Sequence, residues 1–527
     1  MRPGPGEFLS DPAGLGEGQH RTVPLLSYGT GRTIRLSLNH EDMTQPASVF
    51  YHTRKTPLWL PMVFAACLAL VPDVALAEDY ADGAAHYQKK EYSQAFALFS
   101  RAAESGDMRA QAALASMYYN GDGMVADHVK AAFWYQKAAE QGDPQSQFDL
   151  AGMLEEGEGV PQDYARAAEW YGKAAAKGHA KAQDNLGFLY SEGRGVPQDD
   201  AKALMWFKKA ADLGLPEALA NLGVFYSEGR AVEKNLVQAA NLYRQAANQG
   251  LAMAQYELGN ACKDGLGIRQ DLAQAYAWYK KAADQDYAEA QYELGQLYLE
   301  GMGVPEDDEQ ALLWFSKAAD KNLPEAQASI GLMYATGRGT EKHPEKAAKW
   351  YRKAAEQGFA EAQLLLAELY YKGEGVQRND KEALKWYRKA ADQSLPEAQD
   401  SLGLIYTRGD GVARDYKMAV EWFKLAAAQG YAESQNNLGF MYARGLGVKQ
   451  DFEKALAWYR KAVEHNLPQA QFNLGGMYLR GDGVKQNYHT AAQWFKKAAD
   501  QGMDEARESL DRIMRRGQIL SEEDMSI

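Results

Sequence analysis

The sequence repeats itself every 36 residues without a single insertion. One small residue marks the same place in each copy, and it recurs at Ala110, Ser146, Ala182, Ala218, Ala254, Ala290, Ala326, Ala362, Ala398, Ser434, Ala470 and Ala506. A fixed period of this length is typical of solenoids built from helix pairs, in which each pair buries its apolar face only by stacking on its neighbours. The period therefore predicts an all-α solenoid of about eleven helix–turn–helix units, with a partial unit at each end.

Each repeat carries the signals of two helices joined by a tight turn. The first, helix A, opens with proline in several repeats, where the missing N–H removes no helical hydrogen bond. A Gly-x-Gly turn follows, whose second glycine is replaced once, by Ala231. The second, helix B, opens behind Asp or Asn in every repeat but one, where His343 stands. Asx side chains accept hydrogen bonds from the first turn of a helix, so we expect these residues to be caps.

The residue that ends helix B is glycine in seven repeats and Asp286, Asn322, Ser394 or Asn466 in the others. A left-handed residue commonly follows a helix end, and Asp and Asn tolerate that conformation better than other residues with a side chain. We therefore expect a positive φ at this position in each repeat.

Ten tryptophans occupy one repeat position in helix B, and Leu242 occupies the eleventh. A large aromatic side chain that recurs in every repeat indicates packing rather than ligand stacking, so we expect these residues to lie in the core. They are Trp134, Trp170, Trp206, Trp278, Trp314, Trp350, Trp386, Trp422, Trp458 and Trp494. Cys262 stands where most repeats have Tyr, which predicts a small buried hydrophobic residue.

The residues before the repeats have the order of a secretory signal. Basic residues precede an apolar run from Leu58 to Val71, and the small-residue site Ala75-Leu76-Ala77 follows. We interpret residues 43–77 as a signal peptide that starts at Met43, and residues 1–42 as a disordered upstream extension. The alternative is a cytoplasmic extension ahead of a membrane anchor.

Cys67 follows three residues that loosely resemble a bacterial lipoprotein cleavage box, but the residues after it stay apolar, which favours an ordinary cysteine of the signal peptide. The sequence thus predicts an exported protein, periplasmic or secreted, with no membrane span after cleavage. The mature chain would consist of a partial repeat at 78–107, the solenoid at 108–502, and a capping helix with a tail at 503–527.

The bulk composition excludes some functions. The formal net charge of -13 argues against binding to a nucleic-acid backbone, which requires a local excess of cations. The histidines are scattered over different repeat positions, so no metal site is predicted, and nothing indicates a cofactor. No serine is followed three residues later by lysine, which removes the nucleophile arrangement of β-lactamases. We therefore expect no catalytic residues.

The repeat motif A-x-x-x-L-G-x-x-Y-x-x-G-x-G-V-x-x-D, followed by A-x-x-W-[YF]-x-K-A-A-x-x-G, resembles the Sel-one-like repeat (SLR), a relative of the tetratricopeptide repeat. It covers residues 108–502 almost unbroken. The resemblance implies a right-handed superhelix that acts as a protein–protein adaptor. Exported bacterial members are similar to envelope-assembly and host-interaction factors, including one that binds secretory immunoglobulin A, and some members have been described as β-lactamases.

Positions of helix A that vary between repeats are free to select a partner. Two such columns lie four residues apart on one face, and their mix of aromatic, amide and acidic side chains suits an extended peptide or a loop. They contain Phe148, Asp184, Tyr256, Tyr292, Leu364, Asp400 and Phe472 in the first column, and Phe188, Asn260, Gln296, Glu368 and Phe440 in the second. The alternative is that they are tolerant surface residues.

Four asparagines recur beside these columns, and an inward-facing amide could bind the backbone of a peptide. They are Asn185, Asn221, Asn437 and Asn473. The alternative is that they form hydrogen bonds between helices.

The last residue of helix A changes sign along the chain. It is acidic at Glu156, Glu192, Glu228, Asp264 and Glu300, and basic at Lys372, Arg408, Arg444 and Arg480. Basic residues complement the negative end of a helix, whereas acidic residues oppose it. We expect this charged ridge to orient a bipolar partner or to drive head-to-tail self-association; the alternative is drift between duplicated repeats.

The sequence therefore favours a non-catalytic scaffold that binds a protein or peptide from the envelope or from a host on its concave helix A surface. A self-assembling structural envelope protein is the alternative, and a hydrolase of the β-lactamase type is a remote one.

Overall fold

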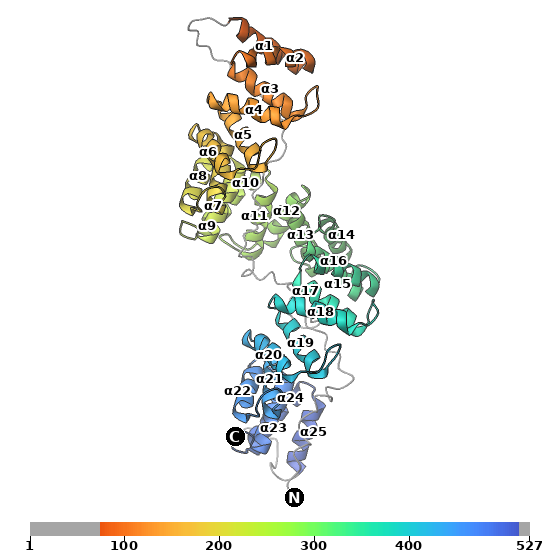
Figure 1. Ribbon diagram of the computed structural model, residues 1–527. Helices are drawn as coiled ribbons and strands as arrows, with labels where there is room; N and C mark the ends of the chain where they lie inside the picture. The colour runs from red at the N-terminus through yellow and green to blue at the C-terminus, as the bar shows by residue number, and fades with distance from the viewer. Residues whose placement is uncertain (1–73, 516–527) are drawn as a thin grey trace. The chain divides into compact units, whose positions relative to one another are not determined.

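The computed structural model describes residues 74–515, and every regular element in that range is an α-helix (Figure 1). The helices A are α1 (Val74–Gln88), α3 (Met108–Asn120), α5 (Pro144–Glu156), α7 (Ala180–Glu192), α9 (Pro216–Glu228), α11 (Ala252–Asp264), α13 (Ala288–Glu300), α15 (Pro324–Thr336), α17 (Ala360–Lys372), α19 (Pro396–Arg408), α21 (Ala432–Arg444) and α23 (Pro468–Arg480). The helices B are α2 (Tyr92–Glu104), α4 (His128–Glu140), α6 (Tyr164–Ala176), α8 (Asp200–Asp212), α10 (Leu236–Asn248), α12 (Leu272–Ala283), α14 (Asp308–Asp320), α16 (Pro344–Glu356), α18 (Asp380–Asp392), α20 (Tyr416–Ala428), α22 (Phe452–Glu464) and α24 (Tyr488–Asp500). A single helix, α25 (Asp504–Arg515), follows the last pair.

The sequence prediction of an all-α array of paired helices is confirmed. Residues 74–107 form a helix pair, α1 and α2, where the sequence suggested only a partial repeat from residue 78. The predicted extension at 1–42 lies outside the described residues, as do the predicted signal peptide up to residue 73 and the predicted tail beyond Arg515.

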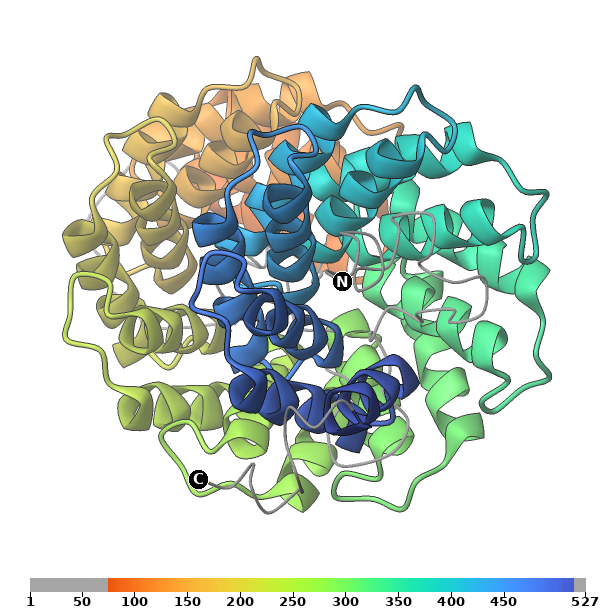
Figure 2. The ribbon, with the colours of Figure 1, turned by 90° about the horizontal axis from the view of Figure 1, so that it is seen from below.

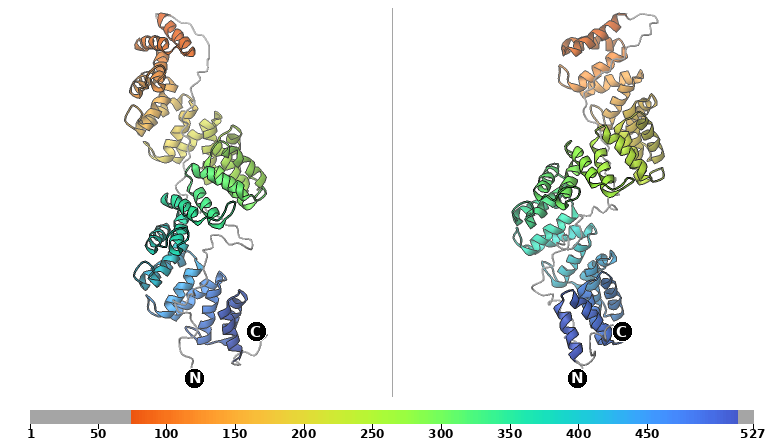
Figure 3. Two further views of the ribbon diagram at one scale, coloured as in Figure 1. Left: turned by 90° about the vertical axis from the view of Figure 1, so that its right-hand side faces the viewer. Right: turned by 180° about the vertical axis from the view of Figure 1, so that it is seen from behind.

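The chain divides into two compact units. Among the described residues, the N-terminal unit comprises 74–294 and 302–304, and the C-terminal unit comprises 295–301 and 305–515. Within each unit, consecutive helices pack on one another, as α7 does on α6 and α8 (Figures 2 and 3). Each repeat thus completes its core with side chains from the next repeat, which is the packing that the period predicted.

The contact between helices A and B depends on a glycine in the middle of helix A. A Cβ atom at Gly223 would lie 2.6 Å from the Tyr243 ring, and one at Gly403 would lie 2.4 Å from the Phe423 ring. Glycine inside a helix costs roughly 0.5–1 kcal/mol relative to alanine. That cost is offset because the absent side chain lets a large aromatic ring reach the buried interface.

The predicted helix caps are confirmed. The Asx side chain before helix B accepts a hydrogen bond from the first helical turn in ten repeats, whereas His343 makes no such bond. The residues that replace glycine beyond helix B have φ between +59° and +69°. Ala231 has φ +51°, so this turn keeps the bend that its glycine counterparts adopt more easily.

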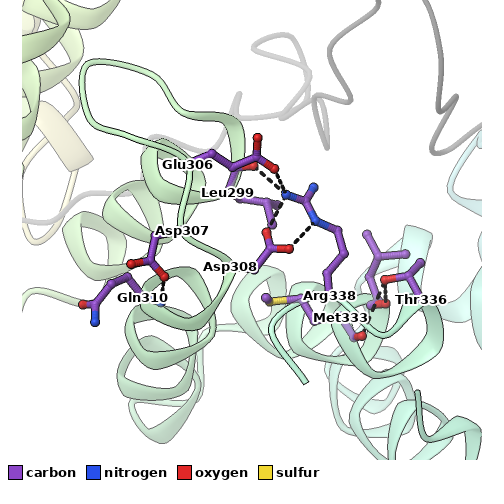
Figure 4. A network of polar contacts seen from close by, with 9 residues as sticks. Leu299, Glu306, Asp307, Asp308, Gln310, Met333, Thr336 and Arg338 are labelled. Carbon is purple, nitrogen blue, oxygen red and sulfur yellow. Dashed lines mark hydrogen bonds and ion pairs between the residues drawn. The ribbon is translucent and has the colours of Figure 1, made fainter. Parts of the chain in front are cut away.

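An arginine in the turn links successive repeats in two places. Arg338 donates hydrogen bonds to Asp308, to Glu306 at 2.7 Å and to the Leu299 carbonyl oxygen at 2.9 Å (Figure 4). Arg230 contacts Asp200 in the same way, at 2.6 Å. These contacts fix the turn of one repeat on the first residue of the preceding helix B.

A buried glutamine ladder also joins the repeats. The fourth residue of helix A is glutamine in ten of the eleven repeats from α3 to α23. In eight of them its amide nitrogen donates to a carbonyl oxygen near the end of the preceding helix B, at 3.0–3.4 Å. Its amide oxygen accepts, in six repeats, from a second glutamine just beyond the following helix B.

The second glutamine of the ladder is missing in four repeats, where Lys177, Leu213, Lys321 and His465 take its place. In those same repeats the amide oxygen of the ladder glutamine, on Gln147, Gln183, Gln291 and Gln435, is buried without a hydrogen-bond partner. The missing second glutamine explains the unpaired oxygen, because no other donor reaches that oxygen.

The expectation that all ten tryptophans lie in the core is wrong for seven of them. Trp170, Trp314 and Trp386 are buried, and the others are half-buried. In eight repeats the ammonium group of the lysine three residues later lies over the indole ring, at 3.5–4.4 Å from a ring centroid. The tryptophans therefore pack at the margin of the core, where a cation covers part of the ring.

Candidate partner-binding surface

The first variable column of helix A is mostly buried. Asp184, Tyr292, Leu364, Asp400 and Phe472 are buried, and Phe148 and Tyr256 are half-buried. The rings pack on the helix B side: Phe472 on Phe495 at 5.4 Å between centroids, and Phe148 on Tyr171 at 5.7 Å. The five buried side chains present little surface to a partner, and only Phe148 and Tyr256 remain partly accessible.

The second variable column lies at the surface. Phe188, Asn260, Gln296, Glu368 and Phe440 are all half-buried. Asn260 accepts a hydrogen bond from the Tyr279 hydroxyl at 2.6 Å, and Glu368 forms an ion pair with Lys372 at 3.0 Å. These contacts hold the polar members in place while part of each side chain remains accessible.

Three of the four asparagines connect neighbouring helices A. Asn221 donates to Asp184 at 3.0 Å, Asn437 donates to Asp400 at 2.9 Å, and Asn473 donates to Asn436 at 2.8 Å. The fourth, Asn185, is a hydrogen-bond partner of Tyr171. The amides therefore serve the packing between helices, which is the alternative that the sequence left open.

Three acidic groups in the N-terminal unit have strongly raised pKa values. Burial raises the pKa of Asp149, of Asp184 and of Glu257 to about 7 in each case. Desolvation is the main cause for all three, because a buried carboxylate loses its hydration. Their hydrogen bonds to Gln145, Asn221 and Asn260 oppose the increase. At neutral pH these groups are close to the midpoint of their titration.

The charged ridge at the end of helix A lies at the surface. Glu228, Asp264 and Arg408 are exposed, and Glu156, Glu192, Glu300, Lys372, Arg444 and Arg480 are half-buried. Arg408 donates a hydrogen bond to the Tyr371 hydroxyl at 3.0 Å, and Arg480 pairs with Asp482 at 2.6 Å.

A second charged column, at the other end of helix A, escaped the sequence analysis. The second residue of helix A is glutamate in four successive repeats of the C-terminal unit, Glu325, Glu361, Glu397 and Glu433. Burial, together with a neighbouring glutamate of the column, raises the pKa of Glu361 and of Glu397. Comparing residues 36 apart, which identified the charged ridge, would also have identified this column.

The two columns give helix A a different charge pattern in the two units. In α17, α19 and α21 of the C-terminal unit, a glutamate begins the helix and a basic residue ends it, which complements the helix dipole. In the N-terminal unit the second residue of helix A is basic at Arg109 and Lys181 but acidic at Glu217 and Glu289, while four acidic residues end the helices. These acidic ends oppose the dipole, so helix stability does not explain them.

Residues 74–515 contain no group of three or more His, Cys, Asp or Glu side chains arranged to hold a metal ion. None of the helices in the same range has the length and apolar character needed to cross a bilayer. Cys262 is a free thiol, and its burial raises the pKa of the thiol.

An uninterrupted series of helix pairs, each buried against the next, defines the class of α-helical repeat proteins. Twelve consecutive copies of the Sel1 repeat match this chain, at residues 74–107, 109–143, 144–179, 180–215, 216–251, 252–287, 288–323, 324–359, 360–395, 396–431, 432–467 and 468–503. The chain therefore belongs to the Sel1 repeat family, and the family resemblance seen in the sequence is confirmed.

Solved structures of Sel1 repeat proteins are similar to this chain. One is c5321, a protective antigen of uropathogenic Escherichia coli strains with an SLR fold; it is 38% identical, the match covers 82% of this chain and 92% of that one, and the TM-score is 0.66. A second is a Sel1 repeat protein from Oxalobacter formigenes, 32% identical over 62% of this chain and 93% of that one, with a TM-score of 0.45. No curated protein matched the chain.

The Sel1 solenoid commonly serves as a protein–protein interaction scaffold, and proteins of this family are generally non-catalytic. The family thus sets the kind of activity to expect.

Proposed function

We propose that this chain is an exported, non-catalytic scaffold that binds a protein or peptide partner on the surface of its helices A. The supporting observation is the contrast between two sets of positions. Positions that hold the repeats together, such as the alanines and the glutamine ladder, are nearly constant and buried, whereas the ninth residue of helix A is half-buried and ranges from Phe188 to Asn260 to Glu368. A surface that varies on a constant framework suits selective recognition.

Two further features support parts of the proposal. The leader before the repeats has the composition of a secretory signal, which supports export to the periplasm or beyond the cell. The similar protein from Escherichia coli is described as a protective antigen, which is consistent with exposure of that protein to a host. Envelope proteins and secreted host proteins, such as immunoglobulins, are therefore the partners to search first.

Site-specific photocrosslinking tests the proposal. A photoreactive phenylalanine analogue would replace Phe188 or Phe440 on helix A, and in the control it would replace Met205 or Leu425, which are exposed on helix B. We expect adducts with envelope extract or host secretions from the helix A positions only. Adducts that form mainly from the helix B positions would refute the assignment of the binding surface.

Self-association is a second candidate, because acidic residues end four helices A of the N-terminal unit and basic residues end four helices A of the C-terminal unit. Light scattering over a range of protein and salt concentrations tests it. Oligomers that grow with protein concentration and dissociate in salt would support it. Hydrolysis of nitrocefin by the purified chain would instead revive the remote β-lactamase alternative.

A further inference from the structure

The last repeats of the C-terminal unit bring two arginines and a buried tyrosine together. Arg444 is the final residue of α21, Arg480 is the final residue of α23, and Tyr459 lies on α22 between them in the sequence. Tyr459 is 0% exposed and shares a core cluster with Ala443 of α21, which precedes Arg444, and with Met477 of α23, one turn before Arg480. In keeping with this placement, burial raises the pKa of its hydroxyl and both guanidinium groups oppose that increase. The three side chains are therefore neighbours.

The hydroxyl of Tyr459 lacks the partner that equivalent tyrosines have. Tyr171 donates to Glu155 at 2.8 Å, and Tyr279 donates to Asn260 at 2.6 Å. These acceptors are the twelfth and ninth residues of helix A. The residues at those two positions before Tyr459 are Ala443 and Phe440, which have no acceptor group, and the Tyr459 hydroxyl is buried without a hydrogen bond.

Arg480 also has a donor without a hydrogen-bond partner. Its Nε atom donates to Asp482 at 2.6 Å, but its Nη1 atom is buried with no hydrogen-bond partner. The guanidinium group lies over Gly476, where a Cβ atom would be 3.1 Å from Nη1. A buried donor without a partner costs about 1–3 kcal/mol, so two such groups in one region of the C-terminal unit need an explanation.

We propose that Arg444, Arg480 and the hydroxyl of Tyr459 form a binding site for a carboxylate group in an acidic segment of the protein partner. This inference rests on the proposed function and adds the chemistry of the partner. A planar guanidinium group donates two parallel hydrogen bonds to a carboxylate, and the hydroxyl supplies a further donor. Arg444 lies over the Phe440 ring at 5.8 Å, which leaves apolar surface beside the site for the neighbouring residue of the segment.

Fluorescence anisotropy of the full chain with a labelled ten-residue peptide of alternating Asp and Gly tests the site. We expect Arg480→Gln to weaken binding about tenfold and Tyr459→Phe several-fold, because each removes a hydrogen bond to a charged group. Arg408→Gln is the matched control, because it removes the same charge from the same ridge; it should weaken binding less than twofold. Equal losses for Arg408→Gln and Arg480→Gln would show diffuse charge attraction and overturn the site.

Glycine provides a second matched pair. Gly476→Ala displaces the Arg480 guanidinium group and should weaken binding, whereas Gly152→Ala, at the same repeat position, meets its nearest atom only at 3.7 Å and should not. Urea unfolding shows whether a variant loses affinity because it is less stable. Tyr459→Phe removes a hydroxyl without a partner and should not lower the urea midpoint, whereas Tyr279→Phe removes the hydrogen bond to Asn260 and should lower it. Unchanged peptide affinity in both Gly476→Ala and Tyr459→Phe would overturn the proposal.

Competition with inorganic phosphate and with acetate distinguishes the anions. If phosphate displaces the peptide at much lower concentration than acetate does, the site is a phosphate site and the carboxylate assignment is wrong. The Arg480→Gln variant also separates the two proposals. If it still forms photoadducts from positions 188 and 440 and binds the acidic peptide with unchanged affinity, the scaffold function is supported and only the carboxylate site is refuted.

Discussion

The incomplete glutamine ladder predicts that one substitution at the surface will stabilise the protein. The amide oxygen of Gln183 is buried without a partner, and the residue that would donate to it is Leu213. Leu213 has φ -84° and ψ 1°, and Gln429, which does complete the ladder in its repeat, has φ -81° and ψ 0°. The backbone is therefore already placed for the glutamine side chain of Leu213→Gln to reach Gln183.

The expected gain is about 1 kcal/mol in the free energy of unfolding. A new hydrogen bond between neutral groups contributes about 0.5–1.5 kcal/mol, and the buried oxygen regains part of the roughly 1–3 kcal/mol that its desolvation costs. Ordering a glutamine side chain removes up to about 2 kcal/mol. The burial lost with leucine is small, because Leu213 is 58% exposed.

Native-state hydrogen exchange is the suitable measurement, because repeat arrays can open one segment at a time and a single unfolding midpoint can conceal a local gain. Amides of α7 and α8 should exchange more slowly in Leu213→Gln. Leu425→Gln is the control, since Leu425 is 51% exposed on a helix B and lies outside the ladder. In a Gln183→Leu background the effect of Leu213→Gln should disappear. A gain that persists there would refute the reasoning, as would equal effects of the two glutamine substitutions.

Three other predictions follow from the same structure. Asp184→Asn should reduce a pH dependence. The folded pKa of Asp184, about 7, lies above the ordinary 3.8, so the contribution of this group to stability is complete below about pH 4 and falls by on the order of 1 kcal/mol per pH unit up to about pH 7. The Asn variant, which restores the kind of amide pair seen at Asn436 and Asn473, should therefore lose less stability than the wild type between urea titrations at pH 4 and pH 8; equal losses would contradict this. Ala231→Gly should raise the free energy of unfolding by about 1 kcal/mol, and with it the urea midpoint, because glycine adopts a positive φ without strain; a lower midpoint would contradict this. His343→Asp should supply the missing N-cap of α16 and raise the free energy of unfolding by about 1 kcal/mol. The amides of the first turn of α16 should then exchange more slowly, and unchanged exchange would contradict this.

The sequence was sufficient for the features that depend on neighbours along the chain. The helix pairs, the Asx caps and the positive φ at Asp286 or Asn466 follow from interactions within a few residues, and the 36-residue period fixed their places. These features repeat because each unit meets the same local requirement.

The tertiary structure decided which side of each helix a partner can reach. Asp184 and Phe188 stand four residues apart on one face of α7, and the sequence grouped them together. Neighbouring helices cross at an angle, so they cover the first and leave the second partly accessible. The same packing places the tryptophans at the margin of the core, and it leaves the hydroxyl of Tyr459 beside two arginines. Such contacts join residues of different helices, and one repeat read by itself does not specify them.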